Sequence, residues 1–168
     1  MKKKKLLVFV VEDDKYFSFL VEHYLKSKSS YHLTMHQEYD VESFTTAEDC
    51  LDEIGRKPDL VICDYALADI GEEGMNGLQF LQAARAIDSR MKVVIVSGKV
   101  DLQNAAIVSG AFDFLIKGDD IILQLGKILE NVEINNDLAH ERNRNWGNAL
   151  IWSFLVGVSC LGILSVIF

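Results

Sequence analysis

The sequence predicts an α/β protein, a parallel sheet covered by helices on both faces, followed by a membrane-spanning tail. Five short apolar runs rich in Val, Ile and Leu are separated by stretches of helical spacing. Runs without polar alternation suit strands buried on both faces, and strands that alternate with helices imply a parallel sheet. The tail is predicted because the last 20 residues carry no charge.

Length, charge and cysteine content narrow the class of protein. A chain of 168 residues corresponds to one domain of ordinary size with little left over. Its formal net charge of -8 argues against nucleic-acid binding, because phosphate contacts need clustered Lys and Arg. Cys50, Cys63 and Cys160 are widely spaced and form no C-x-x-C pattern, which favours a reduced cytosolic setting for the soluble part.

Three strands and two helices are expected in the first part of the chain. The third strand, L-V-I-C-D, follows Pro58 and stops on an acid. The first helix has apolar residues at helical spacing, and the second opens on a capping box with Thr45 at the N-cap and Glu48 three residues later. Tyr31–Asp40 fits either an early start of the second strand or an insertion. The expected bounds are Leu6–Val11, Lys15–Ser27, Val41–Phe44, Thr45 to about Ile54, and Leu60–Asp64.

A long loop, three helices and two more strands follow. The loop, Tyr65–Gly77, is either functional or a simple insertion. Asp101 is the expected cap of the second of these helices, and Gly110 is its expected end. The helices are expected at Leu78–Ile87, 101 to about Ser109 and Ile121–Glu133, and the strands at Val93–Val96 and Phe112–Ile116.

Polar or charged residues end four of the five predicted strands: Glu12 and Asp13, Asp64, Ser97 and Lys117. Right-handed crossovers bring the carboxyl ends of parallel strands to one edge of the sheet, which is where open α/β sheets bind ligands. Any one of these residues could be a strand end that merely faces solvent, but the four ends together favour a site. Three acids at one buried edge repel one another, and Mg²⁺, which prefers oxygen ligands, relieves that conflict.

The residues at this edge are suited to phosphoryl acceptance. A carboxylate beside Mg²⁺ can form an aspartyl phosphate, and a lysine and a hydroxyl can neutralise the oxygens of the transferring group. Asp64, Lys117 and Ser97 supply these parts. A flavin or nucleotide site fits worse, because acids rather than a glycine-rich loop follow the first strand. A haloacid-dehalogenase-type phosphatase has a second Asp two residues after its nucleophile, where this chain has Ala66.

Five motifs over about Lys5–Glu133 resemble the receiver domain of two-component response regulators: V-V-E-D-D, V-I-C-D-Y, M-N-G-L, V-I-V-S-G and G-A-F-D-F-L-I-K. The resemblance implies a flavodoxin-like fold whose five-stranded parallel sheet has the order 2-1-3-4-5. It implies Mg²⁺ as the cofactor, bound by Asp13, Asp64 and the backbone carbonyl of Ala66, with Glu12 acting through water. It also implies that Asp64 is the phosphoacceptor, that Lys117 senses the phosphate, and that Ser97 and Phe114 are the switch residues.

By the same resemblance, the chain would accept a phosphoryl group from a histidine kinase and act on an unknown downstream protein through contacts. It would catalyse its own phosphotransfer and autodephosphorylation, and so would not be an enzyme acting on a separate substrate. There are departures from the family pattern: Ala68 replaces a usual proline, Lys117-Gly118 replaces Lys-Pro, and the loop after Asp64 is longer. The alternative is a receiver-like scaffold that is not phosphorylated and docks partners at the membrane.

The segment 149–168 is predicted to be a transmembrane helix, because 20 uncharged residues span about 30 Å, one bilayer core. Arg142 and Arg144 precede it, so the preceding part should be cytoplasmic. We expect a single-pass protein of the cell inner membrane or plasma membrane. The alternative is a buried core or dimer helix. Small residues four apart, at Ala149, Ser153 and Gly157, suggest a homodimer through the tail.

The predicted organisation therefore has three parts. Residues 1–133 form the receiver domain, and 149–168 form the transmembrane helix. The polar segment between them, 134–148, is either a juxtamembrane linker or an extension of the preceding helix.

Overall fold

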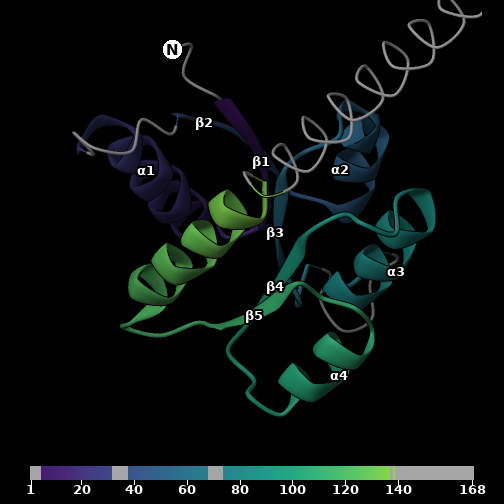
Figure 1. The fold of residues 1–168 in the computed structure, drawn as a ribbon. Helices are drawn as coiled ribbons and strands as arrows, with labels where there is room; N and C mark the ends of the chain where they lie inside the picture. Colours follow the sequence, from purple (N-terminus) through teal and green to yellow (C-terminus); the bar gives the residue numbers. More distant parts are fainter. Residues whose placement is uncertain (1–4, 32–37, 68–73, 137, 139–168) are drawn as a thin grey trace, which may run out of the picture. The chain divides into compact units, whose positions relative to one another are not determined.

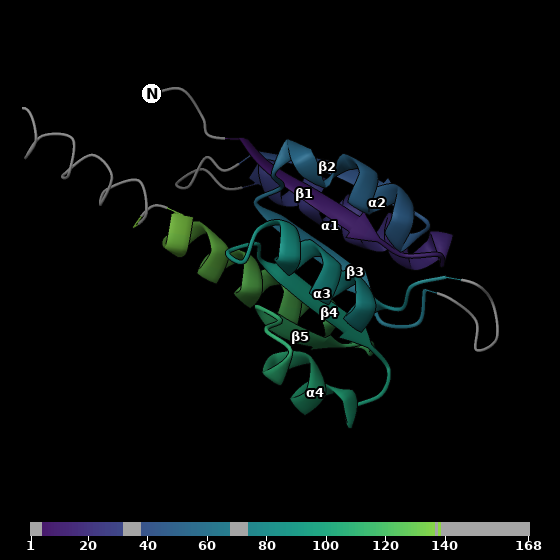
Figure 2. The same cartoon turned by 90° about the vertical axis from the view of Figure 1, so that its right-hand side faces the viewer.

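A five-stranded parallel sheet lies between helices in the computed structural model, which describes residues 5–31, 38–67, 74–136 and 138 (Figure 1). The strand order is β2-β1-β3-β4-β5, and every neighbouring pair is parallel. Figure 2 shows the arrows of β1 and β4 pointing the same way. The strands are β1 (Lys5–Val11), β2 (Glu38–Phe44), β3 (Leu60–Asp64), β4 (Val93–Ser97) and β5 (Asp113–Ile116). The predicted order is confirmed.

Helices cover both faces of this sheet (Figure 1). The helices are α1 (Lys15–Tyr31), α2 (Ala47–Glu53), the short 3-10 helix η1 (Ile54–Arg56), α3 (Gly77–Ile87) and α4 (Leu102–Val108). A last helix begins at residue 121 and runs to 136. Figure 1 shows α1 and the start of that last helix on one face, and α2, α3 and α4 on the other.

The core against α2, α3 and α4 fixes the strand ends that carry the charged residues. All side chains of β3 and β4 are buried, as their uninterrupted apolar sequences predict. Burying each large apolar side chain contributes on the order of 1.5–3 kcal/mol, so the strands are held firmly. This core includes Phe9, Val61, Ile95 and Phe114 of the strands and Cys50 and Phe80 of the helices.

The chain divides into two compact units, Met1–Ile128 and Leu129–Phe168, and the sheet belongs to the first. In the second unit, residues 129–136 and 138 are helical. Among the described residues, no helix has the length and apolar character needed to cross a membrane. The predicted transmembrane helix 149–168 lies outside the described residues, as does most of the segment 134–148, and the proposed domain boundaries stay predictions.

β2 and α1 are each at least three residues longer than predicted. β2 begins at Glu38 rather than Val41, because it pairs with β1 along its full length, from Lys5↔Glu38 to Val11↔Phe44. Residues 38–40 of the ambiguous stretch are therefore an early start of the strand. α1 extends to Tyr31 instead of ending at Ser27. The Ser27 hydroxyl does not end the helix, since it donates to the Tyr24 carbonyl at 2.8 Å within it.

The predicted cap of α2 is wrong by one residue. Thr46, not Thr45, is the N-cap, and its Oγ1 accepts a hydrogen bond from the Asp49 amide at 3.1 Å. The Glu48 carboxylate does not fold back to complete a capping box, because its Oε1 accepts from the Met75 amide at 2.9 Å. A complete capping box is found instead at α3, between Asn76 and Gln79.

The two predicted signals around α4 have different outcomes. Asp101 occupies the N-cap position, but its side chain makes no capping hydrogen bond there. Gly110 ends the helix as predicted, with a φ of +94°, a left-handed conformation that glycine adopts without strain.

Replacing Thr46 should weaken the start of α2. We expect Thr46→Ala to lower the free energy of unfolding by about 1 kcal/mol, because the Asp49 amide loses its acceptor. Urea unfolding followed by circular dichroism measures the change. Thr45→Ala is the matched control and should change the stability by much less; the reverse order would restore Thr45 as the cap.

Candidate functional site

The register of the sheet brings the charged strand ends together. Val11 lies opposite Cys63, so the next residues along β1 and β3 are Glu12 and Asp64. On the other side of β3, β4 and β5 end with Ser97 opposite Ile116. Lys117 follows Ile116 directly. The predicted site residues of four strands therefore share one edge of the sheet.

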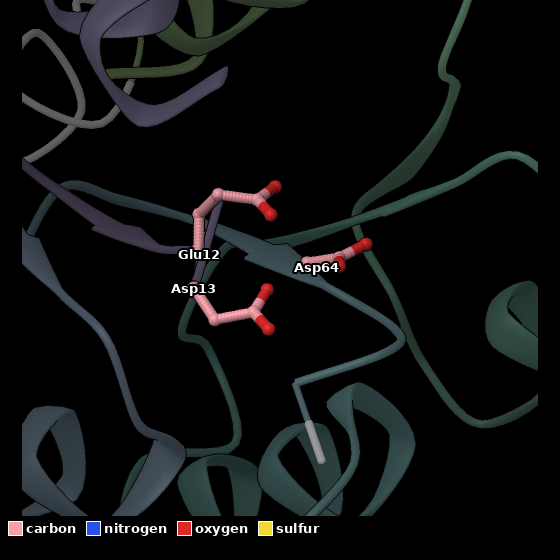
Figure 3. Close-up of side chains that lie close together, drawn as sticks. All are labelled: Glu12, Asp13 and Asp64. Carbon is pink, nitrogen blue, oxygen red and sulfur yellow. The ribbon is translucent and has the colours of Figure 1, made fainter. Parts of the chain in front are cut away.

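Three carboxylates form a cluster at this edge (Figure 3). Glu12, Asp13 and Asp64 each offer an oxygen, and these oxygens lie within 4.8 Å of one another. Glu12 and Asp64 are buried, whereas Asp13 is exposed. The third acid of the run, Asp14, has a different role, because its Oδ1 accepts a hydrogen bond from the Tyr16 amide at 2.8 Å, at the start of α1.

Lys117 supplies the positive charge that the cluster needs. Its Nζ lies 2.8 Å from Glu12 Oε2 and 3.1 Å from Asp64 Oδ2. It also donates a hydrogen bond to Glu12 Oε1 at 3.1 Å. The side chain of Lys117 is 28% exposed, whereas the side chains of Glu12 and Asp64 are only 2% and 5% exposed.

Burial and the Glu12–Lys117 contact have opposite effects on the pKa of Glu12, and the same two factors also oppose each other for Lys117. Burial raises the pKa of Glu12 to about 7, helped by the charge of Asp64 and opposed by the hydrogen bond from Lys117. For Lys117, burial alone would lower the pKa of the ammonium, but the hydrogen bond to Glu12 and the charges of Asp64 and Glu12 outweigh it and raise the pKa. The ammonium therefore stays charged, while the cluster carries more negative charge than one lysine balances.

The donor set fits a hard divalent cation. All three side chains offer carboxylate oxygens, the ligands that Mg²⁺ prefers. The Oε2 atom of Glu12 is buried and accepts no well-directed hydrogen bond, although Lys117 Nζ lies 2.8 Å away. A buried acceptor without a well-directed hydrogen bond is destabilising, and a water molecule bound to a cation would donate one. Ala66, whose carbonyl is the other predicted ligand, is exposed two residues beyond the end of β3.

The two predicted switch residues lie on β4 and β5. Ser97 is buried, its Oγ accepts a hydrogen bond from the Lys99 amide at 3.1 Å, and its carbonyl accepts from the Lys117 amide at 2.9 Å. Phe114 is buried in the core that faces α2, α3 and α4. The structure thus links Ser97 directly to the backbone of Lys117.

Gly77 is a site residue whose role the sequence did not reveal. Its amide donates to the Tyr65 carbonyl at 3.0 Å, which brings the start of α3 against the end of β3. A Cβ atom at this position would lie 2.4 Å from the Asp64 carbonyl oxygen. The motif M-N-G-L marked a turn, but only the fold shows that the turn packs on the backbone of the candidate acceptor.

One family model matches this chain, and many solved structures are similar to it. The family model described as the response regulator receiver domain matches residues 8–125. The receiver domain of a putative Luxo repressor protein from Vibrio parahaemolyticus is 28% identical, with a TM-score of 0.62, and the match covers 80% of this chain and 98% of that one. No curated protein matches the chain.

Two further solved structures share the fold. Chemotaxis protein CheY4 from Vibrio cholerae has a TM-score of 0.62 at 19% identity, and the match covers 77% of this chain and 99% of that one. A CheY-like response regulator receiver domain protein from Methanospirillum hungatei JF-1 has a TM-score of 0.64 at 23% identity, with 80% and 98% covered.

Gly77→Ala should disturb the end of β3. The added methyl would meet the Asp64 carbonyl at 2.4 Å, and we expect a loss of stability on the order of 1–3 kcal/mol together with weaker Mg²⁺ binding. Urea unfolding and calorimetric Mg²⁺ titration measure the two effects. Gly55→Ala is the matched control, because a Cβ there meets nothing within 4 Å. Equal behaviour of the two variants would contradict the close packing.

Proposed function

The chain belongs to the family of response regulator receiver domains, and from that premise we propose that Asp64 accepts a phosphoryl group from a histidine kinase. The observation that carries the proposal is the position of Asp64. Its carboxylate lies at the carboxyl end of a buried strand, 3.1 Å from the Lys117 ammonium group and next to Glu12 and Asp13. A nucleophilic carboxylate, a fixed cation and a set of oxygen ligands are what phosphoryl acceptance requires.

The transfer is a displacement at phosphorus. A carboxylate oxygen of Asp64 forms a bond to phosphorus while the P–N bond to the donor imidazole breaks, and the imidazole leaves after taking up one proton. Lys117 Nζ, already 3.1 Å from Asp64 Oδ2, pairs with a phosphoryl oxygen. The Ser97 hydroxyl donates a hydrogen bond to another phosphoryl oxygen, while its Oγ accepts one from the Lys99 amide.

The phosphoryl group is then lost to water. Water forms the new bond to phosphorus, the bond to the Asp64 oxygen breaks, and the products are inorganic phosphate and the original carboxylate. The chain is thus its own catalyst for gaining and losing the group, which is the sense in which we propose autodephosphorylation.

Mg²⁺ is the proposed cofactor, held by Asp13, Asp64 and the Ala66 carbonyl, with Glu12 acting through water. When bound, it supplies positive charge that offsets the negative oxygens of the transferring group. The carboxylate cluster and the unsatisfied Oε2 of Glu12 support this assignment.

The proposed output is a change at the face formed by β4, α4 and β5. A phosphoryl group adds about 1.5–2 negative charges. Ser97 and Lys117, which would contact it, are joined by a backbone hydrogen bond, so a movement of one is passed to the other. Apolar side chains on or just before α4, Val100, Ile107 and Val108, are exposed. These exposed side chains support contact with a downstream protein.

The second candidate is a receiver-like scaffold that is not phosphorylated. Ala68 and Gly118, where receivers usually have proline, favour it. Calorimetric titration with Mg²⁺ separates the candidates, because a scaffold has no need of the cation. The receiver function predicts binding that Asp13→Asn weakens.

Asp64→Asn should abolish phosphorylation. With acetyl phosphate and Mg²⁺, the wild-type chain should gain one phosphoryl group, seen by intact-mass analysis and as a phosphate-dependent gel shift. The substituted side chain is an amide and lacks the nucleophilic carboxylate, so that variant should gain none. Asp52→Asn, an exposed acid on α2, is the matched control and should behave as wild type. The phosphoacceptor proposal fails if the wild-type chain shows neither change.

We further propose that residues 149–168 anchor the chain in the cell inner membrane or plasma membrane, with the receiver on the cytoplasmic side. Their lack of charge, and Arg142 and Arg144 before them, support the anchor.

The full chain should therefore pellet with membranes after carbonate extraction. A chain that stops before Ala149 should be released, because it lacks the apolar segment. Release of the full chain would refute the anchor.

A further inference from the structure

The aromatic ring of Phe17 makes a third contact with the Lys117 ammonium group. Nζ of Lys117 lies 4.6 Å from the centre of the ring. This is within the range of a cation–π interaction, in which the negative face of the ring attracts the cation. Glu12 and Asp64 are the two charged partners already described, and Phe17 is an uncharged one.

The short segment from Glu12 to Phe17 builds this contact. The Asp14 amide donates to Glu12 Oε1 at 3.2 Å, and Asp14 Oδ1 in turn accepts from the Tyr16 amide at 2.8 Å and the Phe17 amide at 3.4 Å. Asp14 thereby caps α1 and sets the first turn of that helix. The position of the Phe17 ring is tied to that of Glu12 by hydrogen bonds within one stretch of chain.

We propose that Phe17 is a positioning residue, which holds the Lys117 ammonium group at the acidic edge of the sheet. The lysine side chain is long and has many rotamers, so fixing it costs conformational entropy. A carboxylate in the place of Phe17 would also attract the ammonium, but it would repel an incoming phosphoryl group. The ring attracts the cation and adds no negative charge.

The ring contact also persists through the reaction. Glu12 and Asp64 change their partners when a cation or a phosphoryl group arrives, whereas Phe17 keeps the same chemistry throughout. Lys117 can therefore turn from a carboxylate oxygen to a phosphoryl oxygen without leaving the site. This last step rests on the proposed function of Asp64; the contact between Phe17 and Lys117 does not.

The first test is the rate of phosphorylation of the full chain by acetyl phosphate with Mg²⁺. Phe17→Leu and Phe17→Met remove the ring and keep apolar bulk, and we expect each to slow the reaction about two- to fivefold, the range for a partly exposed cation–π contact. Phe17→Tyr should restore the wild-type rate. Phe19→Leu is the matched control, since Phe19 lies on the same helix, is 63% exposed and stacks on His23.

The second test detects the contact without phosphorylation. Protons above an aromatic ring are shifted upfield in NMR spectra, so the ε-methylene signal of Lys117, in the chain labelled with ¹³C-lysine, should be shifted upfield in wild type and Phe17→Tyr. The shift should be lost in Phe17→Leu and Phe17→Met. A Lys117 signal that stays unchanged in both ring-free variants overturns the proposal.

The two tests fail in different ways. If the wild-type chain takes up no phosphate, the proposed function fails, and the lysine signal alone decides the role of Phe17. If wild type is phosphorylated and the ring-free variants react at its rate, the positioning role is refuted. It is also refuted if Phe17→Tyr is as slow as Phe17→Leu.

Discussion

The ion pairs of Lys117 with Glu12 and Asp64 are the interaction on which the site depends. The parallel register places two buried acids at adjacent strand ends, where their charges repel and burial penalises both. Lys117 directly follows β5, which pairs with β4, and its positive charge offsets part of that cost. Burial nevertheless raises the pKa of Glu12 to about 7, with a smaller contribution from the charge of Asp64, so the charged form of Glu12 remains unfavourable at this edge. An edge of this kind has a deficit of positive charge, and a divalent cation fits that deficit.

Other contacts at the edge position these charges. Gly77 allows α3 to pack directly on the Asp64 carbonyl, and Asp14 caps α1 while bonding to the Glu12 side chain. The backbone hydrogen bond between Lys117 and Ser97 joins the carboxyl ends of β5 and β4. Each charged group is therefore fixed by backbone that belongs to a packed element, which is the form of preorganisation that phosphoryl transfer benefits from.

The sequence was most informative where the pattern is local. Apolar runs located β3 and β4, and strand-end chemistry together with the family motifs identified the charged residues that the register assembles. It misplaced the cap of α2, because Thr45 and Thr46 both have a suitable hydroxyl and only the fold shows that Glu48 bonds to Met75 instead. The roles of Gly77 and Phe17 were not predictable, since each depends on a residue distant in sequence, the Asp64 carbonyl and the Lys117 ammonium.

The hydrogen bond between the Gly77 amide and the Tyr65 carbonyl has a consequence for how this protein can evolve. It joins the two ends of the segment 65–77, which follows the candidate acceptor. A change in the length of this segment therefore need not move Asp64. Closing a longer loop is inexpensive, about 0.6 kcal/mol for each doubling of its length. Insertions there can accumulate and diverge while the acceptor stays in place, which offers a route to new partner specificity without loss of the underlying chemistry.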